Sequence, residues 1–311
     1  MKQQVFTFLK GLAMGAANVI PGVSGGTIAL VTGIYERLIN AVKSIDGEAL
    51  GLLLKFDAKA FWRHIDGTFL TLVFLGIGVS IVSLAKILKF LLANDVYAIW
   101  VMAFFFGLIL VSIYSVGRTV QKWNAVTVVA FLIGTAGAVA LALLSPTGEN
   151  EAIWYLLICG VVAMCSMILP GLSGSFVLII MGNYELIMVN AVSELNLKIL
   201  IPVAIGAGLG LLAFSRLLAW VFDHYRDQTI GLLTGFVLGS LLVIWPWKTA
   251  QVELIARPGK EAKEVVLGYD WYLPELGSSA TWIAIVLIVL GGLTIWAMDR
   301  VSVDEGEKRA R

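Results

Sequence analysis

The sequence contains two copies of a short motif whose residues suit the binding of an anion. Residues 20–26 read IPGVSGG and residues 169–175 read LPGLSGS. Proline lacks an N–H and clashes with the preceding helical turn, and glycine relaxes the backbone, so each motif predicts a helix break. The helix that starts after the break has free N–H groups and the positive end of its dipole there. Such a start, with hydroxyl groups beside it, binds anions, and phosphate suits it best.

The candidate phosphate ligands are the residues of the first turn after each break. They are Ser24, Gly25, Gly26 and Thr27 in the first copy, and Ser173, Gly174 and Ser175 in the second. Their N–H groups and hydroxyls would replace part of the hydration shell of a phosphate. Breaks of this kind also occur where helices simply kink for packing, and this alternative stays open.

Charged residues near the breaks form a second group of candidates. Ionisable side chains at membrane depth are costly and usually face a cavity or a partner. Arg37, Lys86 and Arg216 are candidate cationic contacts to a headgroup. Glu36 and Glu185 are candidates for coupling to a proton or a sodium ion, or for pairing with these cations. If the helix ends reach the interface, the same side chains simply extend to water.

The chain carries an internal repeat that extends beyond the motif. A shift of 149 residues superimposes seven identical residues in a window of seventeen, including Gly33 on Gly182 and Glu36 on Glu185. Later features follow in the same order at shifts of 130 and 128 residues, and the first of these places Lys86 on a second cation, Arg216. We therefore expect two homologous halves, as in many transporters.

The rest of the sequence is suited to a membrane. Of its 311 residues, 59% are hydrophobic and only 14% are charged, unlike a soluble domain. The predicted fold class is an all-α polytopic membrane protein, and a net charge of +1 gives no general attraction to nucleic acid. Six stretches are long and apolar enough to span a bilayer: 68–92, 97–117, 124–145, 199–222, 229–246 and 281–298.

The distribution of Lys and Arg indicates how the two broken segments lie in the membrane. Each motif joins two apolar arms, which form either one interrupted span or a re-entrant helical hairpin. With two hairpins, three spans separate them, the repeats are inverted, and the cytoplasmic loops carry 13 Lys and Arg against 7 outside. With two full spans, the distribution contradicts the positive-inside rule. The sequence therefore predicts two inverted repeats, with both termini in the cytoplasm.

The whole chain, 1–311, is expected to form a single membrane domain. Its first repeat is predicted to cover 1–145 and its second 153–298. Residues 247–280 have mixed charges and are predicted to form an insertion outside the membrane. Residues 299–311 are expected to form a charged C-terminal tail.

Other kinds of chemistry find little support in the sequence. GVSGG matches the G-x-S-x-G turn of hydrolases, but that turn follows a strand and needs a histidine and an acid as partners. The chain has two histidines, far apart, and two cysteines in one apolar stretch, so we predict neither catalytic residues nor a metal site. No Walker motif is present, and no cofactor is expected.

The two motifs resemble those of a known family, the bacterial polyprenyl-phosphate transporters. The resemblance is carried by GAANVIPGVSGGTIALVTGIYERLI at 15–39 and LPGLSGSFVLIIMGNYELI at 169–187, and by the length, repeat order and span pattern of the chain. It implies the return of undecaprenyl phosphate, a carrier lipid for cell-envelope polymers, from the outer to the inner leaflet of the cytoplasmic membrane. The second copy has Ser175 where the first has Gly26, so identical half-sites are not expected.

The residues and the resemblance together indicate a transporter and not an enzyme. A charged headgroup will not cross hydrocarbon unaided, whereas a midplane site built from both breaks would replace its hydration while the chain stays in lipid. Rocking of one repeat against the other would expose that site to each leaflet in turn. Two alternatives are a carrier or channel for a small soluble anion and, with less support, a membrane lipid phosphatase. The sequence leaves open the driving ion and whether the chain forms a homo-oligomer.

Overall fold

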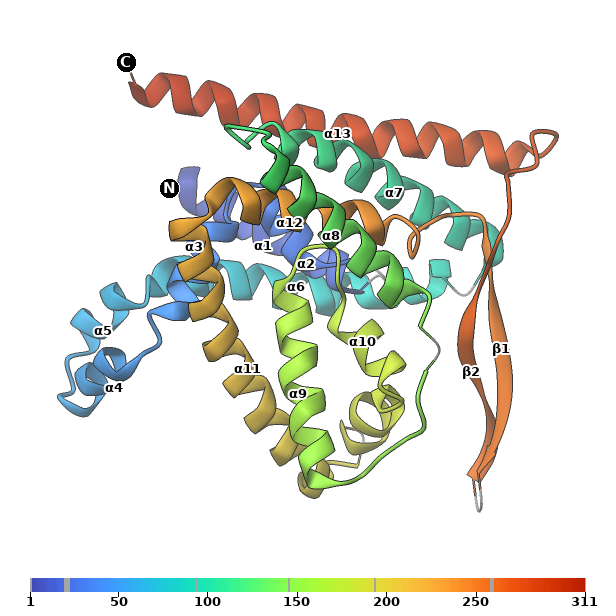
Figure 1. Ribbon diagram of the computed structural model, residues 1–311, viewed down its shortest axis with the longest axis horizontal. Helices are drawn as coiled ribbons and strands as arrows, with labels where there is room; N and C mark the ends of the chain where they lie inside the picture. Colours follow the sequence, from blue (N-terminus) through green and yellow to red (C-terminus); the bar gives the residue numbers. More distant parts are fainter. Residues whose placement is uncertain are drawn as a thin grey trace.

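The computed structural model describes residues 2–19, 23–92, 94–144, 146–192, 194–257 and 260–310. These residues form a helical bundle from which a β-hairpin projects (Figure 1). The earlier elements are α1 (Lys2–Val19), α2 (Gly25–Val31), α3 (Tyr35–Lys43), α4 (Gly47–Leu54), α5 (Ala58–His64), α6 (Gly67–Leu92), α7 (Asp95–Gly117) and α8 (Ala125–Ala142). The later ones are α9 (Ile153–Ile168), α10 (Gly174–Ile180), the π-helix η1 (Glu185–Ala191), α11 (Leu197–His224), α12 (Arg226–Ser240), β1 (Lys248–Arg257), β2 (Lys260–Trp271) and α13 (Ser279–Ala310).

Five of the six predicted spans are confirmed as long apolar helices. Within the described part of the chain, the segments long and apolar enough to cross a membrane are Gly67–Leu84, Asp95–Gly117, Ala125–Ala142, Leu197–His224 and Ser279–Ala297. The sixth prediction, 229–246, is wrong in its extent, because α12 ends at Ser240 and turns follow. Pro246 disfavours a helical conformation at the residue before it, which accounts for the early end.

Each motif separates two helices, as predicted. The chain leaves α1 at Val19 and re-enters a helix at Gly25, and it leaves α9 at Ile168 and re-enters at Gly174. In the second break Gly171 has a φ of 84°, a left-handed conformation that favours glycine. Pro21 and Gly22 of the first motif lie outside the described residues.

The arm after each motif is broken a second time, which the sequence analysis did not anticipate. Gly33 separates α2 from α3, and Gly182 separates α10 from η1. Their φ angles are 70° and 71°, so both adopt the left-handed conformation in which glycine avoids the strain of a Cβ. The identity of these two residues in the repeat therefore corresponds to the same turn.

Two helix pairs pack through glycines at matching positions of the repeat. α1 packs along α6 and α9 along α11. Gly11 leaves no room for a Cβ against the Val73 carbonyl, and Gly160 leaves none against the Val203 carbonyl. Gly160 lies 149 residues after Gly11 and Val203 lies 130 residues after Val73, the shifts found in the sequence. The backbones therefore approach closely at equivalent points.

Two further pairs join the early part of the chain to the late part. α7 packs along α13, and α8 packs along α12 (Figure 1). Gly107 faces the Ile288 carbonyl and Gly235 faces the Phe131 carbonyl, again without space for a Cβ. Gly235 lies 128 residues after Gly107, so this contact also recurs with the repeat. Neither half of the chain completes these pairs alone.

The predicted insertion at 247–280 contains a β-hairpin, which departs from the all-α expectation. β1 and β2 pair antiparallel, with Lys248 opposite Trp271. Alternating and β-branched residues in VELI and EVVL favour strands, a signal that the sequence analysis passed over. In Figure 1 the hairpin lies on the right, opposite both chain ends and α4 and α5. The backbone of the predicted tail, 299–311, continues α13 as far as Ala310.

Candidate functional site

The two broken segments contact each other directly. The Thr27 hydroxyl accepts a hydrogen bond from the Gly171 N–H at 2.8 Å, with Thr27 fully buried. The Ser24 hydroxyl donates to the Leu169 carbonyl at 3.4 Å. The structure therefore brings the predicted ligands of the first motif against the backbone of the second motif.

Tyr35 makes a third contact between the breaks, which sequence reasoning missed. Its hydroxyl donates to the Ile168 carbonyl, the last residue of α9, at 3.0 Å. Its ring is buried and lies 5.9 Å from that of Phe222 on α11. The repeat contained a signal for this residue, because Tyr35 and Tyr184 are among the seven identities.

The first half-site satisfies its own N–H groups. Gly25 donates to the Asn18 side-chain oxygen at 2.8 Å, and Gly26 donates to the Ser24 hydroxyl at 3.2 Å. The Thr27 N–H donates to the Ser24 carbonyl at 3.0 Å. Ser24, Gly25, Gly26 and Thr27 are all buried. In this conformation the first helix start is capped by protein groups.

The second half-site has the same backbone shape but lacks these caps. Ser173 has φ and ψ of −107° and 129°, close to the −111° and 131° of Ser24. The Ser173 and Ser175 hydroxyls are 2.8 Å apart and partly exposed. The position equivalent to Asn18 is Met167, whose side chain packs beside Gly174 and offers no comparable acceptor. Within the described residues, no partner is recorded for the N–H groups of Gly174 and Ser175.

The candidate charges on α3 are in ion pairs near the loops. Arg37 forms two hydrogen bonds with the Asp66 carboxylate, at 2.7 and 3.1 Å, and lies over the Phe69 ring. Glu36 accepts a hydrogen bond from Arg226 of α12 at 2.9 Å. All four charged side chains are about half exposed or somewhat less.

The other candidate charges are also distributed away from the serines. The Arg216 guanidinium donates to the carbonyls of Leu212 and Ile45, at 3.1 and 3.3 Å. Glu185 opens η1 and is partly buried. Lys86 lies in α6, but its side chain is outside the described part of the structure. No contact recorded for the described residues joins Arg37, Glu36 or Arg216 to a serine of either motif.

A polar cleft of about 280 Å³ lies where α3, α11 and α12 meet. Its lining includes Glu36, Asn40 and Arg226, together with Phe222, which contacts Tyr35. The cleft therefore extends from the loops toward the tyrosine that contacts the second break. These loops are on the side that the sequence predicts to be cytoplasmic.

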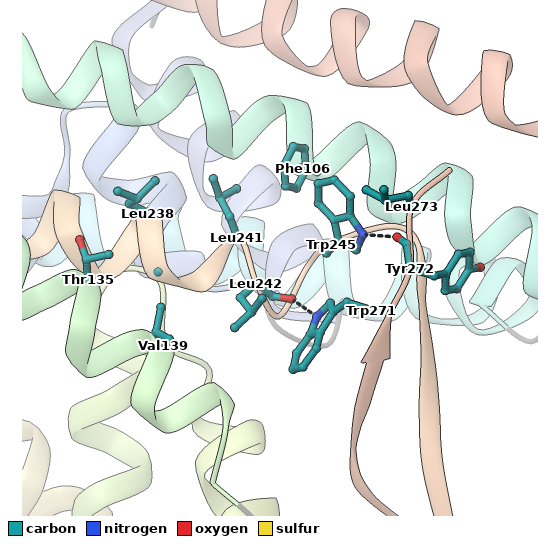
Figure 2. A pocket seen from close by; sticks show the side chains of 11 residues that line it. Phe106, Thr135, Val139, Leu238, Leu241, Leu242, Trp245, Trp271, Tyr272 and Leu273 are labelled. Atoms are coloured by element: carbon teal, nitrogen blue, oxygen red, sulfur yellow. Dashed lines mark hydrogen bonds between the residues drawn. The ribbon is translucent and has the colours of Figure 1, made fainter. Parts of the chain in front are cut away.

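An apolar cavity of about 600 Å³ lies at the foot of the hairpin, between α8 and the end of α12 (Figure 2). It is next to the second break, because Gly171 packs against Phe236 and Val237, and α12 reaches the cavity with its next residue, Leu238. The residues that line it are Phe106, Thr135, Val139, Leu238, Gly239, Leu241, Leu242, Trp245, Trp271, Tyr272 and Leu273.

Groups that could hold a metal are not found among the described residues, where no three His, Cys, Asp or Glu side chains cluster. Cys159 and Cys165 are free thiols on α9. The serines at the breaks have no described histidine beside them, since His64 bonds to Asp46 and His224 to the Trp220 carbonyl. The arrangement at the breaks is therefore one that binds an anion through hydrogen bonds.

Comparison with known proteins identifies the family. The model of the VCA0040-like family, described as undecaprenyl phosphate translocase-like, matches residues 14–262, which include both breaks. The chain belongs to this family. This match confirms the resemblance found in the sequence, and with the five long apolar helices it makes the chain a multi-pass membrane protein.

Two relatives have names that describe a transporter. A polyprenyl-phosphate transporter of Vibrio cholerae is 43% identical over 242 residues, which cover 78% of each chain. A polyprenyl-phosphate transporter of Staphylococcus aureus is 31% identical over 261 residues, which cover 76% of this chain and 85% of the relative. No solved structure matches this chain.

Proposed function

We propose that the protein transports polyprenyl phosphate, returning undecaprenyl phosphate from the outer to the inner leaflet of the bacterial cytoplasmic membrane. The observation that carries the proposal is the second break, where two serine hydroxyls and two N–H groups lie together against the first break. The names of the two relatives support the choice of lipid.

The phosphate binds first at Ser173, Gly174 and Ser175, which are partly open and keep their donors available. Its charge is neutralised by several hydrogen bonds and by the N-terminal dipole of α10. The first half-site contributes Ser24 and Thr27 only after its internal caps are released. Burial of the whole group then excludes water from the headgroup.

Alternating access of two inverted repeats moves the headgroup between leaflets. The proposal is supported by the matching glycine contacts in the two halves and by the equal turns at Gly33 and Gly182. The repeats are 1–145 and 153–298, with both termini in the cytoplasm. The polar cleft at α3, α11 and α12 is the cytoplasmic exit. Such rocking motions are typical of inverted-repeat transporters.

The charged candidates act at the exit and in coupling. Arg37, Arg216 and Lys86 attract the headgroup as it enters or leaves, because they lie outside the central site. Glu36 and Glu185 are the carriers of a coupling proton or sodium ion. Glu36 lies in the wall of the polar cleft, which supports this role.

The experiment that tests the function follows labelled undecaprenyl phosphate between leaflets of sealed liposomes that contain the purified protein. We expect transfer by the wild type and loss of transfer in the double variant Ser173→Ala, Ser175→Ala. The control is Ser83→Ala, whose hydroxyl bonds only within α6, to the Val79 and Ser80 carbonyls.

Inorganic phosphate flux in the same vesicles tests the soluble-anion alternative. An uncapped helix start would bind a small anion as well as a headgroup, so this comparison is needed. Flux of inorganic phosphate without lipid transfer would overturn the proposal. Release of inorganic phosphate from the lipid would instead point to a phosphatase.

A further inference from the structure

The cavity at the foot of the hairpin has the surface of a site for an apolar ligand. Four of its lining residues are aromatic, Phe106, Trp245, Trp271 and Tyr272. The Trp245 indole N–H donates to the Tyr272 carbonyl at 3.1 Å, and that of Trp271 donates to the Leu242 carbonyl at 3.0 Å (Figure 2). The rings therefore present apolar surface to the cavity, because their polar atoms already have partners.

The remaining polar side chain of the lining is also occupied. The Thr135 hydroxyl donates to the Phe131 carbonyl of its own helix at 2.9 Å. A volume of about 600 Å³ is within the usual range of small-molecule sites, which are mostly apolar with aromatic walls. A hydrocarbon chain fits this lining, whereas a hydrated ion does not.

The cavity and the second break are adjacent along α12. Gly171 contacts Phe236 and Val237, and Leu238 and Gly239 line the cavity. One residue of helix rises 1.5 Å, and Ser173 follows Gly171 by two residues, so the serine lies roughly 10 Å from the cavity wall. A molecule with a phosphate joined directly to an apolar chain can occupy both places at once.

A cation beside the cavity complements an anionic lipid. Lys248 is opposite Trp271 in the hairpin, so the two side chains share one face of the strands. Its ammonium group lies 4.1 Å from the centre of the Tyr269 ring. The hairpin is on the side predicted to be outside, from which the returning lipid arrives.

We propose that this cavity binds the first isoprene units of the polyprenyl chain while the phosphate occupies Ser173, Gly174 and Ser175. The inference rests on the proposed function and adds a site for the lipid chain. Recognition of chain and headgroup together separates polyprenyl phosphate from soluble phosphate, which lacks the chain, and from phospholipids, whose straight acyl chains lack methyl branches.

Photolabelling of the wild-type protein tests the site without any substitution. The probe is a polyprenyl phosphate with a diazirine in the isoprene unit next to the phosphate, and the labelled residues are mapped by mass spectrometry. We expect labels on α8, the end of α12 and the foot of the hairpin, such as Val139, Leu238 and Trp271. Unlabelled polyprenyl phosphate should compete, and inorganic phosphate should not.

A different groove provides the contradicting outcome. A smaller apolar groove of about 300 Å³ lies between α9 and α11 and includes Cys165, Leu209 and Phe214. Labels confined to that groove, or spread over the lipid-facing helices, would overturn the inference. Equal competition by a phospholipid would show a general lipid surface and would overturn it too.

Filling the cavity gives a second, independent test. Val139→Trp places a large side chain in the lining, and the matched control Val128→Trp lies on the exposed face of the same helix. We expect Val139→Trp to lower polyprenyl phosphate transfer by about ten-fold. Binding of dodecyl phosphate, which has a short unbranched chain, should stay at the wild-type level in both variants.

The outcomes separate this inference from the proposed function. If the wild type transfers no polyprenyl phosphate, the proposed function fails, whatever the variants do. If the wild type transfers it and Val139→Trp, folded by size-exclusion chromatography, transfers it equally well, only the chain site fails. If Val139→Trp does not fold, the photolabelling of the wild type decides.

Discussion

A single substitution between the repeats determines which helix start can receive an anion. Asn18 caps the Gly25 N–H in the first break, whereas the equivalent Met167 leaves the Gly174 N–H without an acceptor. A phosphate at the second site therefore displaces no protein group. The asymmetry predicted from Ser175 and Gly26 is accompanied by a larger one, at a position outside the motif.

Restoring the cap should block the second site. In Met167→Asn the side-chain oxygen can accept from the Gly174 N–H and compete with the phosphate. We expect polyprenyl phosphate transfer to fall about two- to ten-fold, while thermal stability is unchanged or higher. Met164→Asn, one turn earlier on α9, is the control. Equal transfer by Met167→Asn and the wild type would contradict the assignment of the headgroup to this break.

Lys248 gives a pH dependence that can be measured at the hairpin. Burial lowers the pKa of this lysine from 10.5 to about 8. Between these two values the unfolded chain keeps the proton and the folded chain releases it, so the free energy of unfolding rises with pH.

The measurement compares wild type with Lys248→Met from pH 7 to 10. The wild type should gain stability relative to the variant as the pH rises through about 8, since only the wild type loses a buried charge. Burial raises the pKa of Tyr269, whose contribution is shared by both proteins. A difference that is constant with pH would show that the lysine keeps its usual pKa in the folded protein.

Close helix contacts at equivalent glycines predict equal effects of equivalent substitutions. Gly76 on α6 and Gly206 on α11 have backbone carbonyls where a Cβ would stand, whereas Gly78 and Gly208 face open space. Gly76→Ala and Gly206→Ala should each lower the free energy of unfolding by about 1–3 kcal/mol, because the helices must separate. Gly78→Ala and Gly208→Ala are the matched controls and should cost nothing. Unfolding in detergent micelles measures all four.

The elements could be predicted from the sequence where local chemistry decides them. Long apolar runs and the Pro-Gly motifs indicated five spans and both breaks. The turns at Gly33 and Gly182 were missed, although their identity was noted, because a single glycine does not reveal its φ. The extent of α12 was missed because hydropathy extends past Ser240 while the effect of Pro246 was not weighed.

The contacts within the site could be predicted only in part. The repeat led to the expectation that the two motifs meet, and Thr27 does contact Gly171. The partners of the charges depend on contacts far apart in the sequence, such as Glu36 with Arg226, and no local pattern indicates these. The apolar cavity likewise combines residues of α7, α8, α12 and the hairpin.

At the scale of the whole molecule, the Glu36–Arg226 ion pair connects α3 to α12 across the polar cleft. An exposed pair contributes little to stability, about 0–1 kcal/mol, but it biases the cleft toward the closed state. In Glu36→Gln we expect Asn40→Cys, placed in the cleft, to react about two- to five-fold faster with a water-soluble maleimide.

The control for this measurement breaks a different surface pair. Arg37→Gln removes the pair with Asp66, which is not part of the cleft lining, and should leave the labelling rate unchanged. Cys159 and Cys165 are replaced by alanine in all proteins, so that only the new thiol reacts. Equal rates in Glu36→Gln and its parent would show that the pair does not hold the cleft closed.

The pairing of α7 with α13 has a consequence for how the chain is made. The glycine face of α7 is complete at Gly117, whereas its partner begins at Ser279. At about 5–20 residues per second, the ribosome needs roughly ten to thirty seconds to synthesise the intervening segment. During that interval α7 must remain in the bilayer with its contact surface covered by lipid or by the insertion machinery. Assembly of the bundle is therefore completed only after the last helix has been inserted.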